Sequence, residues 1–567
     1  MNEDFELHHG NVVYFNNYLA FGYIVNENLN PVFFHLNSFS TKLYRTAVFN
    51  QKAGYRLFEK HKDPYSRDYS VLDNTLELQD IGKSSFKEYS EKDDLTIENL
   101  GAILESEDKI IVFQGIEINF DLYFLNKTIP DKLIFFADCV FNNNVLFLQC
   151  QFDRSVFFLS CKFYQNFSFK GSIIKESLHL EASSFLGSGG ASFRGIACEN
   201  IYFDFGIQGP KDLVWFNELN ISNRLIISGT FISQIQFHGD QDSGEKLSRI
   251  NEIIIGKEYY NSQNANRTSI KAEISFFNII GNTIEIINTE IDKISINNLK
   301  ISSLAIYNAE IKGLISISNS TFHGSKACCV IQNASVGTKM LFKNDHFHGS
   351  LDLDGTIADK LVLIEDCNFP GNGSLSVYSL LTDKFRIYPP TLLFNKEEYI
   401  FSCPKFLLLK REKNFKKITK RSTEERLKLT DEYISLRNWF KDAGMIDFED
   451  IAYFNQRSKK RINIFQVVFF RNIFGWGVRL WNLLWSSMAI ILLFSIVFLL
   501  ITDLNISHAM LLSFQSFTGG IFGSWLTLCP QTDNPMSLTS LLVVMERTLG
   551  VIFVTVFIGA YMRKILR

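Results

Sequence analysis

Proline and net charge are both scarce in this sequence. Only 10 of the 567 residues are proline, whereas 54 are phenylalanine, and the formal net charge is −3. A chain that is poor in proline and rich in phenylalanine favours long stacked β structure over disorder. The small net charge gives no electrostatic basis for binding nucleic acid, so we expect no nucleic-acid partner.

Leader, cofactor and metal signatures are missing as well. The N-terminus has neither the basic segment nor the apolar run of a signal peptide, so we expect roughly the first 480 residues to stay in the cytosol. The nine cysteines are odd in number, and no pair with zinc-ligand spacing is followed by a second pair. We therefore expect reduced, structural cysteines, no metal and no cofactor. No nucleotide-binding motif, EF-hand loop or arginine-rich voltage sensor identifies a stimulus.

The chain is rich in large apolar residues spaced five or six apart. A step of five matches neither an α-helix, at about 3.6 residues per turn, nor an extended strand, at about two. It matches a chain that turns a corner every five residues, so that four sides make a coil of about 20 to 22 residues. Such coils stack at about 4.8 Å, and their inward side chains form ladders. The clearest inward positions are Ile118, Phe124, Ile129, Phe135, Phe141, Phe147, Phe152, Phe158, Phe163, Phe169, Ile174, Leu180 and Phe185, and then Ile286, Ile291, Ile296, Ile301, Ile306, Ile311, Ile317 and Phe322.

This spacing resembles the pentapeptide-repeat family of right-handed quadrilateral β-helices. The resemblance is close over residues 118–185 and 284–322, looser over 323–380, and absent from about 206 to 275. On alternate sides of the coil, larger residues replace the family's small residue, so we expect a wider coil than is usual in the family. The small residue, two places before the large one, is kept at Cys139, Cys150, Cys161, Ser172 and Ser183.

The predicted fold class is therefore mainly β. The resemblance implies a parallel β-helix over residues 110–385, with an irregular insertion at about 206–275. Residues 1–109 show no clean period, and we interpret them as a cap of otherwise unknown role, because an open terminal coil would expose unpaired strand edges. Many other parallel β-helices cleave polysaccharides with clustered carboxylates. The nearest such pair here, Asp352 and Asp354, flanks an inward leucine and is expected to be a solvated strand face, so we predict no enzyme.

A helical connector is predicted for residues 390–470. After two consecutive prolines the five-residue period stops, and the run TDEYISLRNWFKDAGMIDFEDIAYFNQRS resembles the helical hairpin that joins pentapeptide repeats to an ion-channel pore in bacterial channel-like proteins. Its first helix opens near Thr423 with acidic residues in the first turn, and Gly444 ends it. The hairpin is either a passive spacer or a stiff link that transmits force. The aromatic residues 465–470 then suit a segment that lies along the membrane face.

Residues 471–567 carry a predicted all-α membrane domain. Two apolar runs, residues 481–501 and 538–562, are each long enough to cross a hydrocarbon core of about 30 Å as a helix. Lysines and arginines precede the first run and follow the second, and none occurs between residues 503 and 545. The positive-inside rule then places both termini in the cytoplasm, so the apolar segment 507–528 dips into the membrane and returns. Re-entrant backbone is tolerated only where it is buried in protein or lines a water-filled pore.

The order of helix, pore helix, glycine-rich loop and helix resembles the two-helix potassium-channel pore. The resemblance implies a pore helix at residues 507–517 with the selectivity filter after it. In the closing run MERTLGVIFVTVFIGAYMRKILR, Gly550 lies near the usual flexible position of the inner helix, and Gly559 lies where inner helices could cross at a gate. The implied filter residues are Thr518, Gly519, Gly520, Ile521, Phe522 and Gly523.

Ile521 departs from the family pattern, because it stands where the family has its first filter glycine. A potassium filter turns carbonyl groups toward the axis, which requires residues that tolerate left-handed conformations, and a β-branched residue resists them. We therefore predict a cation-conducting pore with altered or weak potassium selectivity. At the outer mouth, Asp533 would either bias the pore toward cations or belong to a plain surface turn. Glu546 and Arg547 would either form pairs there or anchor the last helix at the interface.

The leading hypothesis is an ion channel of the bacterial inner membrane. One re-entrant segment per chain cannot enclose a pore, so several copies, most simply a homotetramer, must close a ring in the lipid bilayer around monovalent cations. The cytosolic β-helix would gate this pore or bind an unknown cytosolic regulator. One alternative is a membrane-anchored scaffold whose β-helix docks a cytosolic partner. Another is a triggered pore that depolarises the membrane.

Overall fold

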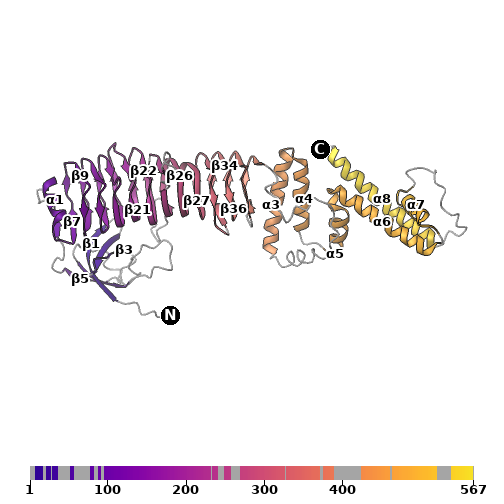
Figure 1. Cartoon of the computed structure of the whole chain (residues 1–567), viewed down its shortest axis with the longest axis horizontal. Coiled ribbons are helices and arrows are strands. Elements are labelled where there is room, and N and C mark those ends of the chain that lie inside the picture. Colours follow the sequence, from indigo (N-terminus) through magenta and orange to yellow (C-terminus); the bar gives the residue numbers. More distant parts are fainter. Residues whose placement is uncertain are drawn as a thin grey trace. The chain divides into compact units, whose positions relative to one another are not determined.

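The computed structural model of the chain contains two compact units, and each is considered by itself. One unit comprises Met1–Ser376 and Leu380–Leu392, and the other comprises Val377–Ser379 and Leu393–Arg567. The first unit consists mainly of strands, and the second contains helices (Figure 1). The described residues are 7–16, 21–26, 28–35, 51–56, 77–81, 87–90, 95–231, 233–239, 248–256, 268–325, 327–370, 374–388, 423–459, 463–502, 504–519 and 538–565.

The first unit is built on a parallel β-solenoid of about 12 turns, which confirms the predicted fold class. Residues one coil apart pair in register, as Phe141 does with Phe163 and Ile296 with Ile317. These pairs have the predicted coil length of about 20 to 22 residues. In the N-terminal half the strands are β6 Lys87–Tyr89, β7 Ile110–Gln114, β8 Glu117–Ile118, β9 Leu122–Leu125, β10 Thr128–Ile129, β11 Leu133–Ala137, β12 Val140–Phe141, β13 Val145–Leu148, β14 Gln151–Phe152, β15 Val156–Leu159, β16 Lys162–Phe163, β17 Phe167–Ser168, β18 Ile173–Glu181, β19 Ser184–Phe185, β20 Ala191–Ser192, β21 Ala197–Gln208, β22 Val214–Asn217 and β23 Asn220–Phe231.

Stacked aromatic and aliphatic ladders fill the interior of the solenoid. The rings of Phe113, Phe136 and Phe158 lie on consecutive coils with centroids 4.9 Å apart at each step. This step matches the strand spacing of about 4.8 Å, so each ring packs against the ring of the next coil. The remaining strands are β24 Ile235–His238, β25 Ser248–Ile255, β26 Thr268–Ile287, β27 Thr289–Ile301, β28 Ser303–Tyr307, β29 Glu310–Ile311, β30 Ile315–Ser318, β31 Thr321–Phe322, β32 Ala327–Gln332, β33 Ser335–Val336, β34 Lys339–Lys343, β35 His346–Phe347, β36 Ser350–Asp352, β37 Ile357–Ala358, β38 Leu361–Glu365, β39 Ser374–Ser376, β40 Leu381–Thr382 and β41 Phe385–Tyr388.

Small inward residues directly follow left-handed corners of the coil. Asp138 and Ser160 both have φ of 53°, and the next residues, Cys139 and Cys161, are fully buried. The corner brings backbone close, because Cys161 Sγ lies 3.2 Å from the carbonyl oxygen of Phe136. The short side chains of the cysteines and serines suit this close approach in these coils. In later coils asparagine, which tolerates positive φ, takes these corners at Asn278, Asn298, Asn319 and Asn344.

The cysteines are packing residues in the described part of the chain. Seven of them are free thiols and buried. Burial raises the pKa of Cys367 to about 12, so its thiol stays protonated and unreactive at neutral pH. Cys403 and Cys529 lie outside the described residues.

The solenoid continues through residues 206–275, where the sequence predicted an irregular insertion. Phe216 stacks on Phe237, and Phe237 stacks on Phe276, at centroid distances of 5.0 and 4.8 Å. The inward ladder is therefore unbroken. The spacing fails in the sequence because the coil between Phe237 and Phe276 contains two extra segments, residues 240–247 and 257–267, whose structure lies outside the description.

A five-stranded antiparallel sheet precedes the solenoid, in the order β3-β2-β1-β4-β5. It lies beside the first coils (Figure 1), where Tyr14 and Phe21 belong to one apolar cluster with Phe135 and Phe157 of the solenoid. Helix α1, Ile97–Glu105, lies at the N-terminal end of the solenoid. The region expected to be a cap thus contains a flanking sheet and a separate end helix. The sheet strands are β1 Leu7–Asn16, β2 Phe21–Asn26, β3 Pro31–His35, β4 Gln51–Arg56 and β5 Glu77–Ile81.

One buried carboxyl group makes the stability of the solenoid depend on pH. Asp345 takes a small-residue position of the ladder and accepts hydrogen bonds from the backbone amides of Ser320 (2.8 Å) and Lys343 (3.0 Å). Burial raises the pKa of Asp345 from 3.8 to about 7. The folded state therefore holds a proton that the unfolded state has lost above pH 4, so stability falls as the pH rises from about 4 to about 7.

Asp345→Asn is expected to remove most of this pH dependence. The solenoid's unfolding temperature, followed by β-sheet circular dichroism between pH 4.5 and 8, should fall less steeply in this variant than in the wild type. Asp359→Asn makes the same charge change at an exposed position and should keep the wild-type slope. Equal slopes in the wild type and the Asp345 variant would contradict the prediction.

All regular secondary structure in the described part of the second unit is helical. Gly444, with φ of 71°, ends the first helix, where the sequence placed the turn of the hairpin. Residues 389–422, the start of the predicted connector, lie outside the described residues. The helices are α3 Thr423–Asp442, α4 Ile446–Lys459, α5 Ile464–Gln466, the π-helix η3 Val467–Ile473, the 3-10 helix η4 Gly475–Gly477, α6 Leu480–Ile501, α7 Ile506–Phe517 and α8 Leu538–Ile565.

Candidate functional site

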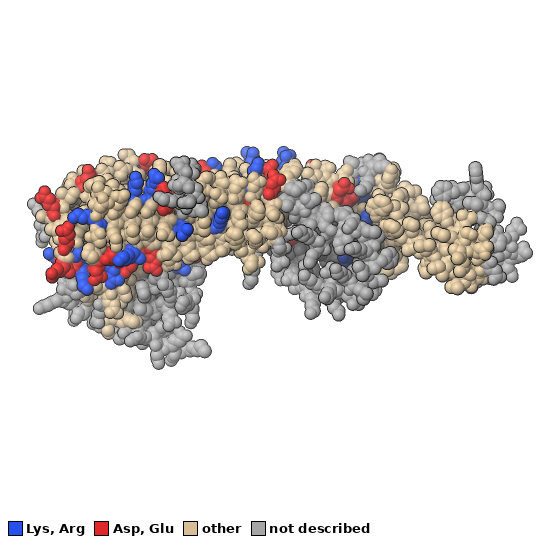
Figure 2. Space-filling model, in the orientation of Figure 1, with Lys and Arg blue, Asp and Glu red and all other residues tan. Residues whose placement is uncertain are grey.

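Two helices of the second unit are long and apolar enough to cross a membrane. The segments Leu480–Ile501 and Leu538–Arg563 have mean hydropathies of 2.6 and 2.2 over their most apolar windows, and most of their residues are exposed. Figure 2 shows no charged side chain on their described surface in this view, whereas acidic and basic residues are interspersed over the solenoid. An exposed apolar surface of this kind suits a lipid environment and not water.

Helix α7 packs between α6 and α8. Ser513, in the middle of α7, lies with its Oγ 2.8 Å from the carbonyl oxygen of Ile491 in α6, and it also hydrogen bonds Oε1 of Glu546 in α8. The carboxyl group of Glu546 is fully buried in this contact. Apolar packing surrounds it, with Phe498 of α6 and Leu512 of α7 in one cluster. Both long helices therefore fix the orientation of α7.

The close approach at Gly550 sets the depth that α7 reaches. A Cβ atom at Gly550 would lie only 1.7 Å from the carbonyl oxygen of Phe517, the last residue of α7. Gly550 lies near the middle of the 28-residue helix α8. Helix α7 starts shortly after α6 ends, and its 12 residues span about 18 Å. It therefore runs from one end of the α6–α8 pair to about half its length, as a re-entrant helix would.

Two of the predicted filter residues follow directly at this point. Thr518 caps α7 and its hydroxyl donates to the carbonyl oxygen of Phe514 at 2.9 Å, while Gly519 has φ of 66°. Arg547 donates from Nη2 to the carbonyl oxygen of Gly519 at 3.2 Å. The neighbours Glu546 and Arg547 on α8 thus contact the middle of α7 and Gly519, the second residue after its end. The other filter positions and one mouth residue lie outside the described residues: Gly520, Ile521, Phe522, Gly523 and Asp533.

The two glycines of α8 differ in their surroundings. Gly550, predicted near a flexible position, lies at the contact with α7. Gly559, predicted at a crossing of inner helices, has no atom within 4 Å of a built Cβ, so it faces open space in the single chain. Ser513 was not predicted from the sequence, because a serine within an apolar helix gives no signal of its own.

An aromatic π-helical segment precedes α6. Phe465, Phe469 and Phe470 are all exposed, and Phe465 stacks on Phe469 with centroids 4.4 Å apart. The segment ends in a turn in which Trp476 has φ of 53°, and Trp476 stacks on Phe470. An exposed aromatic stripe beside an apolar helix fits the expected position along a membrane face.

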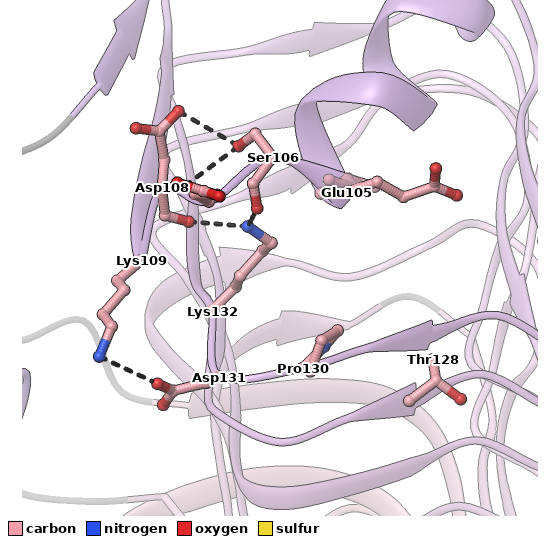
Figure 3. A pocket seen from close by; sticks show the side chains of 10 residues that line it. Glu105, Ser106, Asp108, Lys109, Thr128, Pro130, Asp131 and Lys132 are labelled. Atoms are coloured by element: carbon pink, nitrogen blue, oxygen red, sulfur yellow. Dashed lines mark hydrogen bonds and ion pairs between the residues drawn. The ribbon is translucent and has the colours of Figure 1, made fainter.

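A cavity of about 380 Å³ lies at the start of the solenoid, lined by residues from Leu104 to Lys132 (Figure 3). Lys132 donates from Nζ to the carbonyl oxygens of Ser106 and Asp108, and Lys109 pairs with Asp131 at 3.3 Å. Both lysines of the hollow are therefore bonded, Lys132 to backbone and Lys109 to an acidic side chain. In the part of the chain that the structure describes, no three His, Cys, Asp or Glu residues are grouped to hold a metal ion.

The pair Asp352 and Asp354 is tied to neighbouring coils. Asp352 accepts a hydrogen bond from the Gln332 amide at 3.0 Å, and Asp354 accepts one from the Ser376 hydroxyl at 2.6 Å.

Comparison with known proteins adds no assignment, because no protein-family model, curated protein or solved structure matches the chain.

Proposed function

We propose that this protein is a cation channel of the bacterial inner membrane, with both termini in the cytoplasm. The observation that carries the proposal is the position of α7, which reaches about half the length of α6 and α8, ends in contact with Gly550 and is followed by Thr518 and Gly519. Backbone that stops at half depth in a membrane must be buried in protein or line water. A water-lined path formed by several copies of the chain satisfies this requirement.

The electrostatics of α7 favour cations. The C-terminal end of a helix carries a partial negative charge of about half an electron, and here it points to the middle of the proposed membrane segment. A ring of such ends, most simply four, would stabilise a monovalent cation where the lipid disfavours it most. Because Ile521 replaces a filter glycine, we propose weak selectivity between potassium and sodium. The solenoid and the helices α3 and α4 would regulate this pore from the cytosol.

Ion flux in proteoliposomes tests the proposal. The purified full-length chain should leak both potassium and sodium, at rates within about tenfold of each other. Replacing Gly519, which has φ of 66°, by valine should abolish the leak, since valine resists the left-handed conformation. Leu500→Ala, a change on the exposed surface of α6, is the matched control and should conduct. An assembled oligomer that never conducts would instead support a membrane-anchored scaffold, and strong potassium selectivity would refute the selectivity proposed.

A further inference from the structure

We propose that one face of α4 clamps together the ends of the two membrane-crossing helices α6 and α8, and that this clamp holds the proposed pore closed. The face consists of Asp450, Tyr453 and Phe454, which we call the α4 clamp. These positions are three and four residues apart and therefore lie on the same side of the helix. The inference rests on the proposed channel function, and it identifies the element that regulates the pore.

Arg563, in the last turn of α8, is held at two points of the clamp. Its Nη2 lies 2.8 Å from Oδ1 of Asp450, and its guanidinium carbon lies 5.0 Å from the ring centre of Tyr453. The side chains of Arg563 and Asp450 are only 27% and 11% exposed. A partly buried ion pair of this kind is screened less than a surface pair, and the ring adds a cation–π contact.

Arg479, the residue just before α6, is held at the third point. Its guanidinium carbon lies 3.6 Å from the ring centre of Phe454, which is itself buried. The turn before it packs on α8 as well, because Phe474 and Phe553 have ring centres 5.0 Å apart. The start of α6 and the end of α8 are therefore bound to the same short helix.

The charges around the clamp make Asp450 the critical member. The ring of Tyr453 also faces Arg437 and Arg457, at 5.0 and 5.5 Å. Glu449 lies 3.5 Å from Arg437 and so partly balances that charge. With Asp450 neutral, Arg563 would approach two other guanidinium groups with no acid of its own, and it would leave the clamp.

The α4 clamp belongs to a helix that packs closely against α3. Helices α3 and α4 form a hairpin in which Phe440 packs on Phe448 at 5.7 Å and Ala452 is fully buried. While the clamp is intact, the end of α8 cannot move away from the start of α6. A force on the hairpin reaches α8 through Arg563, so opening requires the Asp450–Arg563 contact to break.

Single substitutions in the clamp should raise ion flux. We expect Asp450→Asn and Arg563→Gln each to increase the leak by about tenfold, which corresponds to about 1.4 kcal/mol in the open–closed equilibrium. The double variant should leak no more than either single variant, because both changes break the same contact. Asp447→Asn, the same charge change in the exposed first turn of α4, is the matched control and should behave as the wild type. If the wild type conducts, unchanged or lower flux in both single variants, or additive effects, would overturn the proposal.

Hydrogen exchange separates failure of the clamp from failure of the channel. In detergent, backbone amides in the last two turns of α8 should exchange faster in Asp450→Asn than in Asp447→Asn or the wild type. If no variant conducts but this difference is seen, the proposed channel fails while the clamp contact stands. If exchange is the same in all three proteins, the clamp fails whatever the flux.

Discussion

Replacing Gly550 by alanine is expected to displace α7 and abolish ion flux. The added Cβ would lie 1.7 Å from the carbonyl oxygen of Phe517 and within 3.0 Å of two further backbone atoms of the same residue. Backbone cannot rotate away as a flexible side chain can, so α7 must shift as a whole. That shift would pull Ser513 from Glu546 and the Gly519 carbonyl from Arg547. We expect the free energy of unfolding of the helical unit to fall by about 3 kcal/mol or more, as for overpacking at a rigid contact.

The matched control is Gly559→Ala in the same helix. Alanine is a better helix former than glycine by about 1 kcal/mol, so helix propensity alone would stabilise both variants. The built Cβ at Gly559 meets nothing within 4 Å. The unfolding temperature of the helical unit in detergent, measured by circular dichroism, should therefore fall for Gly550→Ala and stay level or rise for Gly559→Ala. Gly550→Ala protein with wild-type stability and flux would refute the seating of α7 described here.

The local rules of the sequence predict the solenoid well where coils keep their length. Inward ladders such as Phe141 with Phe163 follow from a fixed step. The prediction fails at residues 206–275 because register shifts in β21 and added segments between Phe237 and Phe276 change the count without breaking the ladder. It fails for the N-terminal sheet because that sheet packs against coils more than a hundred residues away, and no local period marks such a contact.

The sequence also predicts some features of the candidate site and not others. The apolar lengths of α6 and α8 and the shorter apolar helix α7 between them are visible in hydropathy, since each is a property of one segment. The contact of Asp450 with Arg563 joins residues 113 positions apart, and no local pattern couples them. No local pattern in the sequence predicts the hydrogen bond of Ser513 with Glu546 either. The sequence predicts Gly550 as a flexible position, whereas its close packing against α7 is a property of the folded structure.

Phe158→Ala is expected to cause the largest loss of stability in the solenoid. Phe158 is fully buried, stacks on Phe136 at 4.9 Å and meets Phe167 edge-on at 5.2 Å. Removing such a ring typically lowers the free energy of unfolding by about 3 to 5 kcal/mol. The loss has two causes, because buried apolar surface is removed and a cavity remains that rigid neighbours cannot fill. Tyr164→Ala, which removes an exposed ring in the same coil, should change stability by less than about 0.5 kcal/mol.

The consequence of this cavity depends on how the two units of the chain are coupled. In a stack of coils each repeat is stabilised only by its neighbours, so a cavity at Phe158 should let the N-terminal coils melt ahead of the rest. Urea unfolding should then show a β-sheet transition shifted to lower concentration, with the helical transition unchanged. A single transition that shifts as a whole would contradict independent units. Because the proposed clamp passes force from the α3–α4 hairpin to α8, that outcome would mean the solenoid's stability bears directly on the pore.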